Sequence, residues 1–310
     1  MPSAHAESRN APSATLKPLR GTRVLSLALN LPGPAALLRL RTMGANCVKV
    51  EPPPPQGAPT EARGDPMSLY SAEAYATLHR GISTLCVDLK TDPGQAALHR
   101  ALARADVLLT SFRPSALRKL GLGWRSLHRR HPTLSMVAIV GAPGPQAEAP
   151  GHDLTYLADA GLIDGLTLPP TLFADMAGAL LASEAVLRAI VARERTASRR
   201  GSFQEVALSD AAAWLALPRH WGLTQPTGAV GGAHAGYRVY ACKDGRVAVA
   251  ALEPHFAKAL CRAAGIDAHD NAALHEPATH DTLARFFAGR TRKQIERLAA
   301  AHDIPLHTLA

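Results

Sequence analysis

Cysteine is scarce in this chain of 310 residues, which contains only four. Cys47, Cys86, Cys242 and Cys261 are far apart and form no Cys-x-x-Cys pair, the usual spacing of zinc ligands and redox dithiols. Three of the four lie in apolar segments. The pattern argues against a disulfide framework or a metal site and predicts reduced cysteines in the core.

Long apolar runs are also missing. No run approaches the roughly 18 residues that would cross a bilayer, and the N-terminus is rich in Ala, Ser and Pro, without the apolar segment of a signal peptide. We therefore expect a cytoplasmic protein with no membrane partner. Residues 1–17 hold few large apolar side chains and are predicted to be disordered.

Aromatic residues make up only 5% of the chain, whereas the excess of Lys and Arg gives a formal net charge of +9. The basic residues are scattered and few aromatics lie between them, so the sequence does not predict nucleic-acid binding. A small phosphorylated molecule would need only a few of these cations. The remainder are expected on the solvated surface.

The first two thirds of the chain alternate between strand and helix patterns. Apolar, strand-like runs occur at residues 23–29, 46–51, 83–89, 106–110 and 134–140. Helical patterns lie between them, the first at residues 35–43 after a turn at Gly33-Pro34. This order predicts an α/β fold, a Rossmann-like large domain with a mainly parallel sheet covered on both faces. No Gly-x-Gly-x-x-Gly follows the first strand, so a dinucleotide cofactor is not predicted.

A second, smaller domain is expected towards the C-terminus. The Gly- and Pro-rich segment 225–236 is interpreted as a linker, which leaves residues 18–224 for the large domain and 237–310 for a small α+β domain. Two strand-like runs flank Lys243-Asp244-Gly245, a hairpin signal. Helical patterns follow at about 254–264, 278–289 and 291–301.

Residues 151–196 place two candidate catalytic groups at the starts of successive apolar, helix-like runs. His152 begins the first and Asp175 the second, so together they could act as a general acid and base. A structural interpretation also stands. A carboxylate is stabilised at a helix N-terminus by the helix dipole and by unpaired backbone N–H groups, and a lone histidine is commonly a hydrogen-bonded structural residue.

Several segments together resemble the class III CoA-transferase (CaiB/BaiF) family, and the resemblance extends from about residue 20 onward. The matching text is GTRVLSLALNLPGPAALLRLRTMGANCVKVEPP, DLKTDPGQAAL, ADVLLTSFRPSALRKLGLGW, HPTLSMVAIVG, GHDLTYLADAGL, the helix of Asp175 that ends in RERT, and YRVYACKDGRVAVAALEPHF. The ordered set is specific, although each piece alone is weak. The closest branch is that of α-methylacyl-CoA racemase.

The resemblance implies an enzyme that acts on acyl-CoA thioesters, with two subunits interlocked as a homodimer. It assigns the central catalytic role to Asp175 and carries the racemase branch's histidine and glutamate over to His152 and Glu253. Coenzyme A enters as part of the substrate, without a permanently bound cofactor or metal. For the CoA portion the resemblance implies four binding residues, Arg80, Phe112, Arg113 and Lys119. Lys49 is an additional candidate for the phosphates, or else an outward-facing strand residue.

Three departures from the family pattern bear on these expectations. The family's Asn-Arg-Gly-Lys-Arg run appears as His79-Arg80-Gly81-Ile82-Ser83, with fewer cations. Lys119 replaces the usual arginine and cannot make a bidentate phosphate contact. The sequence ends where family members continue from the small domain back to the large one, so we expect an incomplete C-terminus.

Three activities stay open on the sequence. The favoured one is racemisation of a 2-methylacyl-CoA, in which one residue removes the α-proton and another returns it. In that scheme Glu253 orients the imidazole of His152, and backbone N–H groups at the start of the Asp175 helix stabilise the enolate. The second is CoA transfer to a carboxylic acid through an aspartyl intermediate at Asp175. The third is a degenerate family member without catalytic activity.

Overall fold

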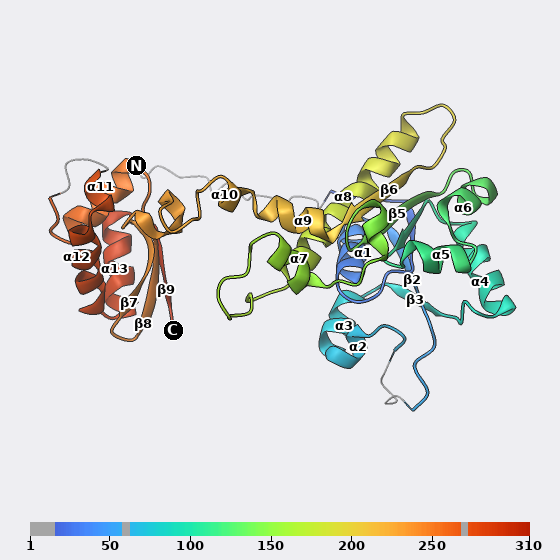
Figure 1. Cartoon of the computed structure of the whole chain (residues 1–310), viewed down its shortest axis with the longest axis horizontal. Helices are drawn as coiled ribbons and strands as arrows, with labels where there is room; N and C mark the ends of the chain where they lie inside the picture. The colour runs from blue at the N-terminus through green and yellow to red at the C-terminus, as the bar shows by residue number, and fades with distance from the viewer. Residues whose placement is uncertain (1–15, 58–62, 268–271) are drawn as a thin grey trace, which may run out of the picture. The chain divides into compact units, whose positions relative to one another are not determined.

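The computed structural model describes residues 16–57, 63–267 and 272–310, so nearly all of the segment predicted to be disordered lies outside the described residues. The chain divides into two compact units, Met1–Leu215 and Ala216–Ala310 (Figure 1). The limits at residues 224 and 236 that the sequence suggested for the two domains stay predictions.

The first unit is built on a six-stranded sheet in the order β3-β2-β1-β4-β5-β6, and every neighbouring pair is parallel. The Rossmann-like α/β architecture expected from the sequence is therefore confirmed. The order reverses between β1 and β4, which makes this the switch point of the sheet. In chain order the strands are β1 (Arg23–Ser26), β2 (Asn46–Glu51), β3 (Ser83–Cys86), β4 (Val107–Thr110), β5 (Ser135–Val140) and β6 (Phe203–Ala207).

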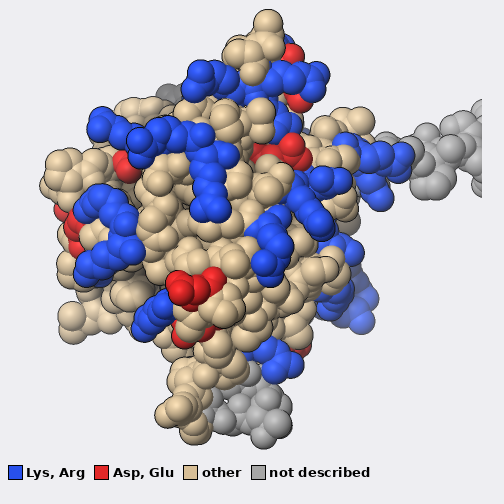
Figure 2. All heavy atoms as spheres, turned by 90° about the vertical axis from the view of Figure 1, so that its right-hand side faces the viewer, with Lys and Arg blue, Asp and Glu red and all other residues tan. Residues whose placement is uncertain are grey.

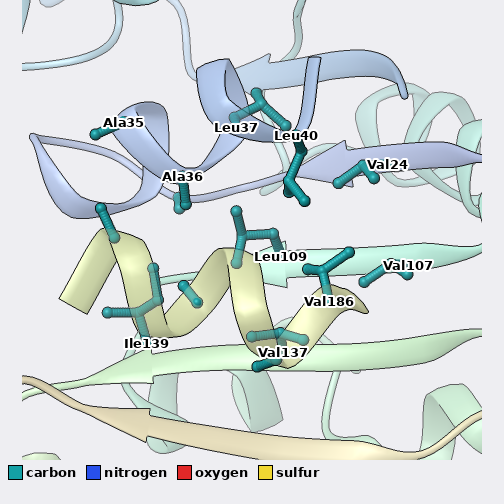
Figure 3. Close-up of a cluster of buried hydrophobic side chains, with 14 of the residues drawn as sticks. Val24, Ala35, Ala36, Leu37, Leu40, Val107, Leu109, Val137, Ile139 and Val186 are labelled. Carbon is teal, nitrogen blue, oxygen red and sulfur yellow. The ribbon is translucent and has the colours of Figure 1, made fainter. Parts of the chain in front are cut away.

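Alternate residues of the central strands enter two separate cores, one on each face of the sheet. Val107 and Leu109 of β4 pack beneath α1 (Pro32–Thr42) and α8 (Phe173–Glu194). Leu108 points to the opposite face, which is covered by α4 (Asp92–Leu102), α5 (Pro114–Lys119) and α6 (Trp124–Arg130). Figure 3 shows the first core, where α1 and α8 lie side by side over the sheet. Apolar side chains on both faces explain why the strands are continuous apolar runs in the sequence.

Most helices of this unit lie in the crossover connections between the parallel strands, and the last one follows β6. α1 begins at Pro32, so Gly33-Pro34 forms its first turn and not the separate turn predicted from the sequence. Proline is accepted there because the first N–H groups of a helix have no intrahelical partner. The α-helices are α1 (Pro32–Thr42), α2 (Met67–Tyr70), α3 (Ala72–Leu78), α4 (Asp92–Leu102), α5 (Pro114–Lys119), α6 (Trp124–Arg130), α7 (Asp153–Asp159), α8 (Phe173–Glu194) and α9 (Leu208–Leu215).

The second unit combines a small antiparallel sheet with helices. β7 (Tyr237–Cys242) and β8 (Gly245–Ala250) form the predicted hairpin, and β9 (Leu306–Leu309) pairs with β8. Its core joins Tyr240, Val247 and side chains of the three longer helices. The α-helices are α10 (Leu217–His220), α11 (Pro254–Ala263), α12 (Pro277–Ala288) and α13 (Arg292–His302).

No helix among the described residues combines the length and the apolar character needed to span a membrane.

Candidate functional site

A cavity of about 150 Å³ opens at the carboxyl edge of the six-stranded sheet, at the switch point between β1 and β4. Leu29 and Asn30, which follow β1, line it together with Ser111, Phe112 and Arg113, which follow β4. In open parallel sheets this crevice is where ligands bind, because the loops on either side diverge to opposite faces of the sheet. The fold therefore identifies this cavity as the candidate site.

Both residues of the predicted acid and base pair line this cavity. His152 is exposed and immediately precedes α7, whereas Asp175 lies half-buried in the first turn of α8. The backbone N–H of His152 donates a hydrogen bond of 3.0 Å to Thr155 Oγ1, which fixes the start of α7. Two groups that are 23 residues apart in sequence thus meet in one pocket.

The carboxyl group of Asp175 lies in an environment that favours its protonated form. Burial is the main cause and the neighbouring Asp153 adds to it, so that the pKa of Asp175 rises to about 6 against an opposing effect of His152. Asp153 is itself buried, and its Oδ1 accepts a hydrogen bond of 3.0 Å from the backbone N–H of Asp175. Asp153 therefore caps α8 and also changes the acidity of the catalytic candidate.

That hydrogen bond narrows one sequence expectation. The backbone N–H of Asp175 is one of the groups at the start of its helix that were expected to stabilise an enolate, and it is already bonded to Asp153. The role of the other N–H groups of that turn stays a prediction.

Tyr156 contributes a hydroxyl group to the same pocket. Burial and the charge of Asp175 raise the pKa of Tyr156, and the nearby Arg113 offsets only part of this increase. Gly141 and Gly151 lie so close to the ring that a Cβ on either would overlap the hydroxyl. The two glycines therefore make room for Tyr156 beside the carboxyl group.

The residues assigned to CoA by resemblance fall into two groups. Phe112 and Arg113 line the cavity and follow β4, as a role in binding requires. Arg80 follows α3 and Lys119 ends α5; both are exposed, and neither lines this cavity. Glu253 is exposed in the second unit, where it precedes α11. The roles of all five residues stay predictions.

Lys49 does not match either sequence expectation, because its side chain is fully buried among acidic and aromatic neighbours.

Many other lysine and arginine side chains of the described residues are exposed. Figure 2 shows lysine and arginine side chains spread in separate groups over one face, with uncharged surface between them.

Sequence reasoning missed three residues at or near the site. Asp153 was visible as the acid next to His152, but its partner lies 22 residues further along the chain. Tyr156 lies in the first turn of α7, four residues after His152, and both side chains line the cavity. Asn30 was not singled out, because its left-handed φ of 65° and its hydrogen bond to the distant Asp65 are seen only in the structure.

The fold and site define a Rossmann-like α/β protein with a small ligand cavity that holds a carboxyl group, an imidazole and a tyrosine. The model of CoA-transferase family III matches residues 19–310, and the chain belongs to that family. The resemblance found in the sequence is thereby confirmed.

Relatives of the chain bear the names of both racemases and transferases. The "Alpha-methylacyl-CoA racemase" of Mus musculus is 31% identical over 288 residues, which cover 87% of this chain and 71% of the relative. The "Probable fatty acyl-CoA transferase" of Mycobacterium tuberculosis is 35% identical over 188 residues, 58% of this chain and 48% of the relative. The chain thus spans about half the length of the first curated relatives that it matches.

A solved structure supports the fold assignment. The crystal structure of the same mycobacterial protein superimposes with a TM-score of 0.80 at 26% identity, covering 95% of this chain and 86% of the other.

Proposed function

We propose that the protein exchanges the α-proton of an acyl-CoA thioester and so racemises a 2-methylacyl-CoA. The observation that carries this proposal is the presence of Asp175 and His152 in one cavity, with the pKa of Asp175 raised to about 6. A carboxylate with a pKa near neutrality is a stronger base than an ordinary one and still largely ionised at pH 7. The names of the racemase relatives agree with this chemistry.

The reaction needs two groups with opposite proton states. Asp175 as carboxylate takes the α-proton of one enantiomer, and the C–H electron pair moves into the thioester to form an enolate. His152 as imidazolium then delivers a proton to the opposite face of the same carbon. For the other enantiomer the two residues exchange roles. No net oxidation occurs and no redox cofactor is required.

The CoA portion is proposed to contact the segment that follows β4. Phe112 offers an apolar ring for adenine or the pantetheine arm, and Arg113 offers a cation for phosphate. Arg80 and Lys119 are proposed as further phosphate contacts because both are exposed cations. Coenzyme A enters and leaves as part of the substrate.

CoA transfer is the second candidate, and the names of several relatives favour it. Asp175 would then attack the thioester carbonyl carbon, the CoA thiolate would leave, and an acyl-aspartyl anhydride would form. A raised pKa also suits this role, since a more basic carboxylate is a better nucleophile. The two candidates differ in whether a covalent intermediate exists.

The first experiment follows the α-proton of a 2-methylacyl-CoA by NMR in deuterated water. We expect exchange that falls at least about 100-fold in Asp175→Asn, the usual scale for losing a general base. Asp159→Asn, which removes an exposed acid from α7, is the matched control and should retain exchange. Equal exchange in wild type and Asp175→Asn would contradict the assignment.

Absence of exchange in the wild type would shift the proposal to transfer. Hydroxylamine then traps a covalent aspartyl adduct if Asp175 acts as a nucleophile. Failure to retain CoA on equilibrium dialysis would contradict both activities and leave a non-catalytic member of the family.

We further propose that the protein acts in the cytoplasm as a homodimer, as the family resemblance implies. Sizing chromatography with light scattering checks the subunit number. A monomer at micromolar concentration would contradict the dimer.

A further inference from the structure

A cluster of ionisable side chains is buried along β2 and the segments that follow it. Its centre is the ammonium group of Lys49, which lies 3.0 Å from Glu51 Oε1 and 2.8 Å from His79 Nε2, and contacts Asp65 Oδ2. The side chains of Lys49 and Asp65 are fully buried. Tyr75 completes the group by donating its hydroxyl to Glu51 Oε1 over 2.9 Å.

The hydrogen bonds of this cluster are complete at Lys49. His79 Nδ1 lies 2.7 Å from the carbonyl oxygen of Tyr75, so it carries the proton and donates it, which leaves Nε2 as an acceptor. Burial and the charge of Lys49 both lower the pKa of His79, in agreement with a neutral ring. The three N–H groups of the ammonium therefore meet three acceptors, on Glu51, Asp65 and His79.

The same geometry accounts for a group of potential metal ligands. Glu51, Asp65 and His79 offer ligand atoms within 4.8 Å of one another. The Lys49 ammonium reaches all three, so it supplies the positive charge that a metal ion would otherwise bring. The Lys49 ammonium therefore takes the place that a metal ion would have among Glu51, Asp65 and His79.

One member of the cluster reaches the wall of the candidate site. While Oδ2 of Asp65 contacts Lys49, its Oδ1 accepts hydrogen bonds of 3.0 Å each from the backbone N–H groups of Asn30 and Met67. Asn30 lines the cavity with Asp175, and its φ of 65° lies in the left-handed region, which is uncommon for residues other than glycine and which asparagine adopts more readily than most. The preceding residue, Leu29, donates its N–H to Ser111 Oγ over 3.1 Å.

We propose that Asp65, locked in place by Lys49, is a positioning residue that holds Asn30 in its left-handed conformation and so preorganises the pocket wall between β1 and α1. The identity of the ligand rests on the proposed function, namely an acyl-CoA thioester. A wall that is already in place before binding loses less conformational freedom when the ligand arrives. The proposed effect of Asp65 on ligand binding is local, because it acts through the backbone of Asn30. It can therefore be measured separately from a change in the stability of the whole fold.

The role requires an acceptor on each oxygen of residue 65, which makes Asp65→Asn the decisive variant. An asparagine of the same size carries an NH₂ group in place of one oxygen. If this group faces Asn30 and Met67, their N–H groups lose their acceptor; if it faces Lys49, the contact that fixes residue 65 is lost. Asp92→Asn, an exposed aspartate at the start of α4, is the matched control.

The main measurement is hydrogen exchange of the ligand-free protein by mass spectrometry, read on peptides that span Asn30. We expect Asp65→Asn to speed exchange there at least tenfold, while peptides of the core of α8 stay unchanged and Asp92→Asn matches the wild type. The dissociation constant for a 2-methylacyl-CoA should rise about tenfold in parallel. Unchanged exchange at Asn30 in a folded Asp65→Asn protein would overturn the proposal.

Asn30 variants decide the matter if Asp65→Asn does not fold. Glycine adopts a positive φ without strain, whereas alanine does not. Both variants lose the amide side chain, so the comparison between them isolates the backbone. Asn30→Ala should bind acyl-CoA at least tenfold more weakly than Asn30→Gly; equal exchange and binding in both would overturn the proposal. Because the exchange measurement uses no ligand, a wild type that binds no acyl-CoA would end the proposed function while the positioning role is still tested.

Discussion

At the scale of single residues, the site depends on one carboxyl group that the fold makes hard to ionise. Asp175 lies half-buried near the buried Asp153, and its pKa is about 6 in place of the ordinary 3.8. Folding therefore favours the protonated form, and ionisation at higher pH costs stability. The raised pKa that makes Asp175 a stronger base therefore also lowers the free energy of unfolding when the group is ionised.

Asp175→Asn is accordingly expected to stabilise the protein at pH 7–8. The folded state binds the proton more tightly than the unfolded state, so the cost is absent below about pH 4, grows as the pH rises and is complete above about pH 6. With partial solvent screening, we expect a gain of about 1–2 kcal/mol. Chemical denaturation at several pH values measures it, and a gain that did not shrink between pH 6 and 4 would contradict this cause.

The glycines around Tyr156 give a second prediction at this scale. Gly141→Ala should lower the rate of α-proton exchange about tenfold, because its Cβ would overlap the Tyr156 hydroxyl and displace the whole ring within the cavity. Tyr156→Phe removes that oxygen and leaves the nearest ring carbon 3.2 Å from the new Cβ. The double variant should therefore exchange faster than Gly141→Ala alone.

Gly151 supplies the control for that experiment. A Cβ there would also lie 2.7 Å from two ring carbons of Tyr156, so Tyr156→Phe should not rescue Gly151→Ala. Equal rescue at Gly141 and Gly151 would contradict the proposed overlap. Steady-state kinetics of Tyr156→Phe, the two alanine variants and the two double variants provides the measurement.

The candidate catalytic residues could be predicted from the sequence more easily than the residues that hold the cavity wall in place. His152 and Asp175 stand at helix starts and could be predicted as a pair, and the structure brings both to one cavity. Asp65, a partner of both Asn30 and Lys49, lies 35 residues from the first and 16 from the second along the chain. A charged residue within a strand looks like an outward-facing one until its partners are known, and for that reason the buried Lys49 was not predicted.

At the scale of elements, the start of α8 connects stability with acidity. Asp153, at the start of α7, accepts a hydrogen bond from the backbone N–H of Asp175 and so caps α8. Its negative charge also raises the pKa of Asp175. The two effects can be separated, because an amide oxygen can still accept the hydrogen bond but carries no charge.

Asp153→Asn should therefore move the pH dependence of activity while largely preserving stability. Activity that needs the Asp175 carboxylate rises through about pH 6 in the wild type, and its midpoint should fall in Asp153→Asn because a neighbouring charge is lost. Asp153→Ala should shift the midpoint similarly but also cost about 1 kcal/mol, the usual effect of a lost cap. An unchanged midpoint in both variants would contradict the electrostatic role of Asp153.

Most elements of the sheet could be predicted because their strands are apolar on both faces. β2 matches its predicted range, residues 46–51. β1 is shorter than predicted, since the chain leaves the regular strand after Ser26 towards the cavity, although Leu27 still donates to Leu109 over 2.8 Å. Local patterns predict where a strand can form, but the point where it ends depends on the neighbouring strand.

At the scale of the whole molecule, Glu253 tests whether the small unit contributes to the reaction. If Glu253 orients the imidazole of His152, Glu253→Gln should lower kcat about tenfold with little change in KM. Glu276→Gln is a matched control, because Glu276 is also an exposed glutamate that precedes a proline at a helix start in the same unit. Equal kinetics of both variants and the wild type would contradict a role for Glu253 in the reaction.

The opposing demands on Asp175 have a practical consequence for surveys of sequence variants. A library scored only for cellular abundance should rank neutral substitutions at this position above the wild type, whereas a library scored for growth on an acyl-CoA substrate should reject them. Few buried positions should show such opposite signs, because most substitutions in a core lower both scores. The pair of scores would therefore locate the reactive centre without any knowledge of the natural acyl group.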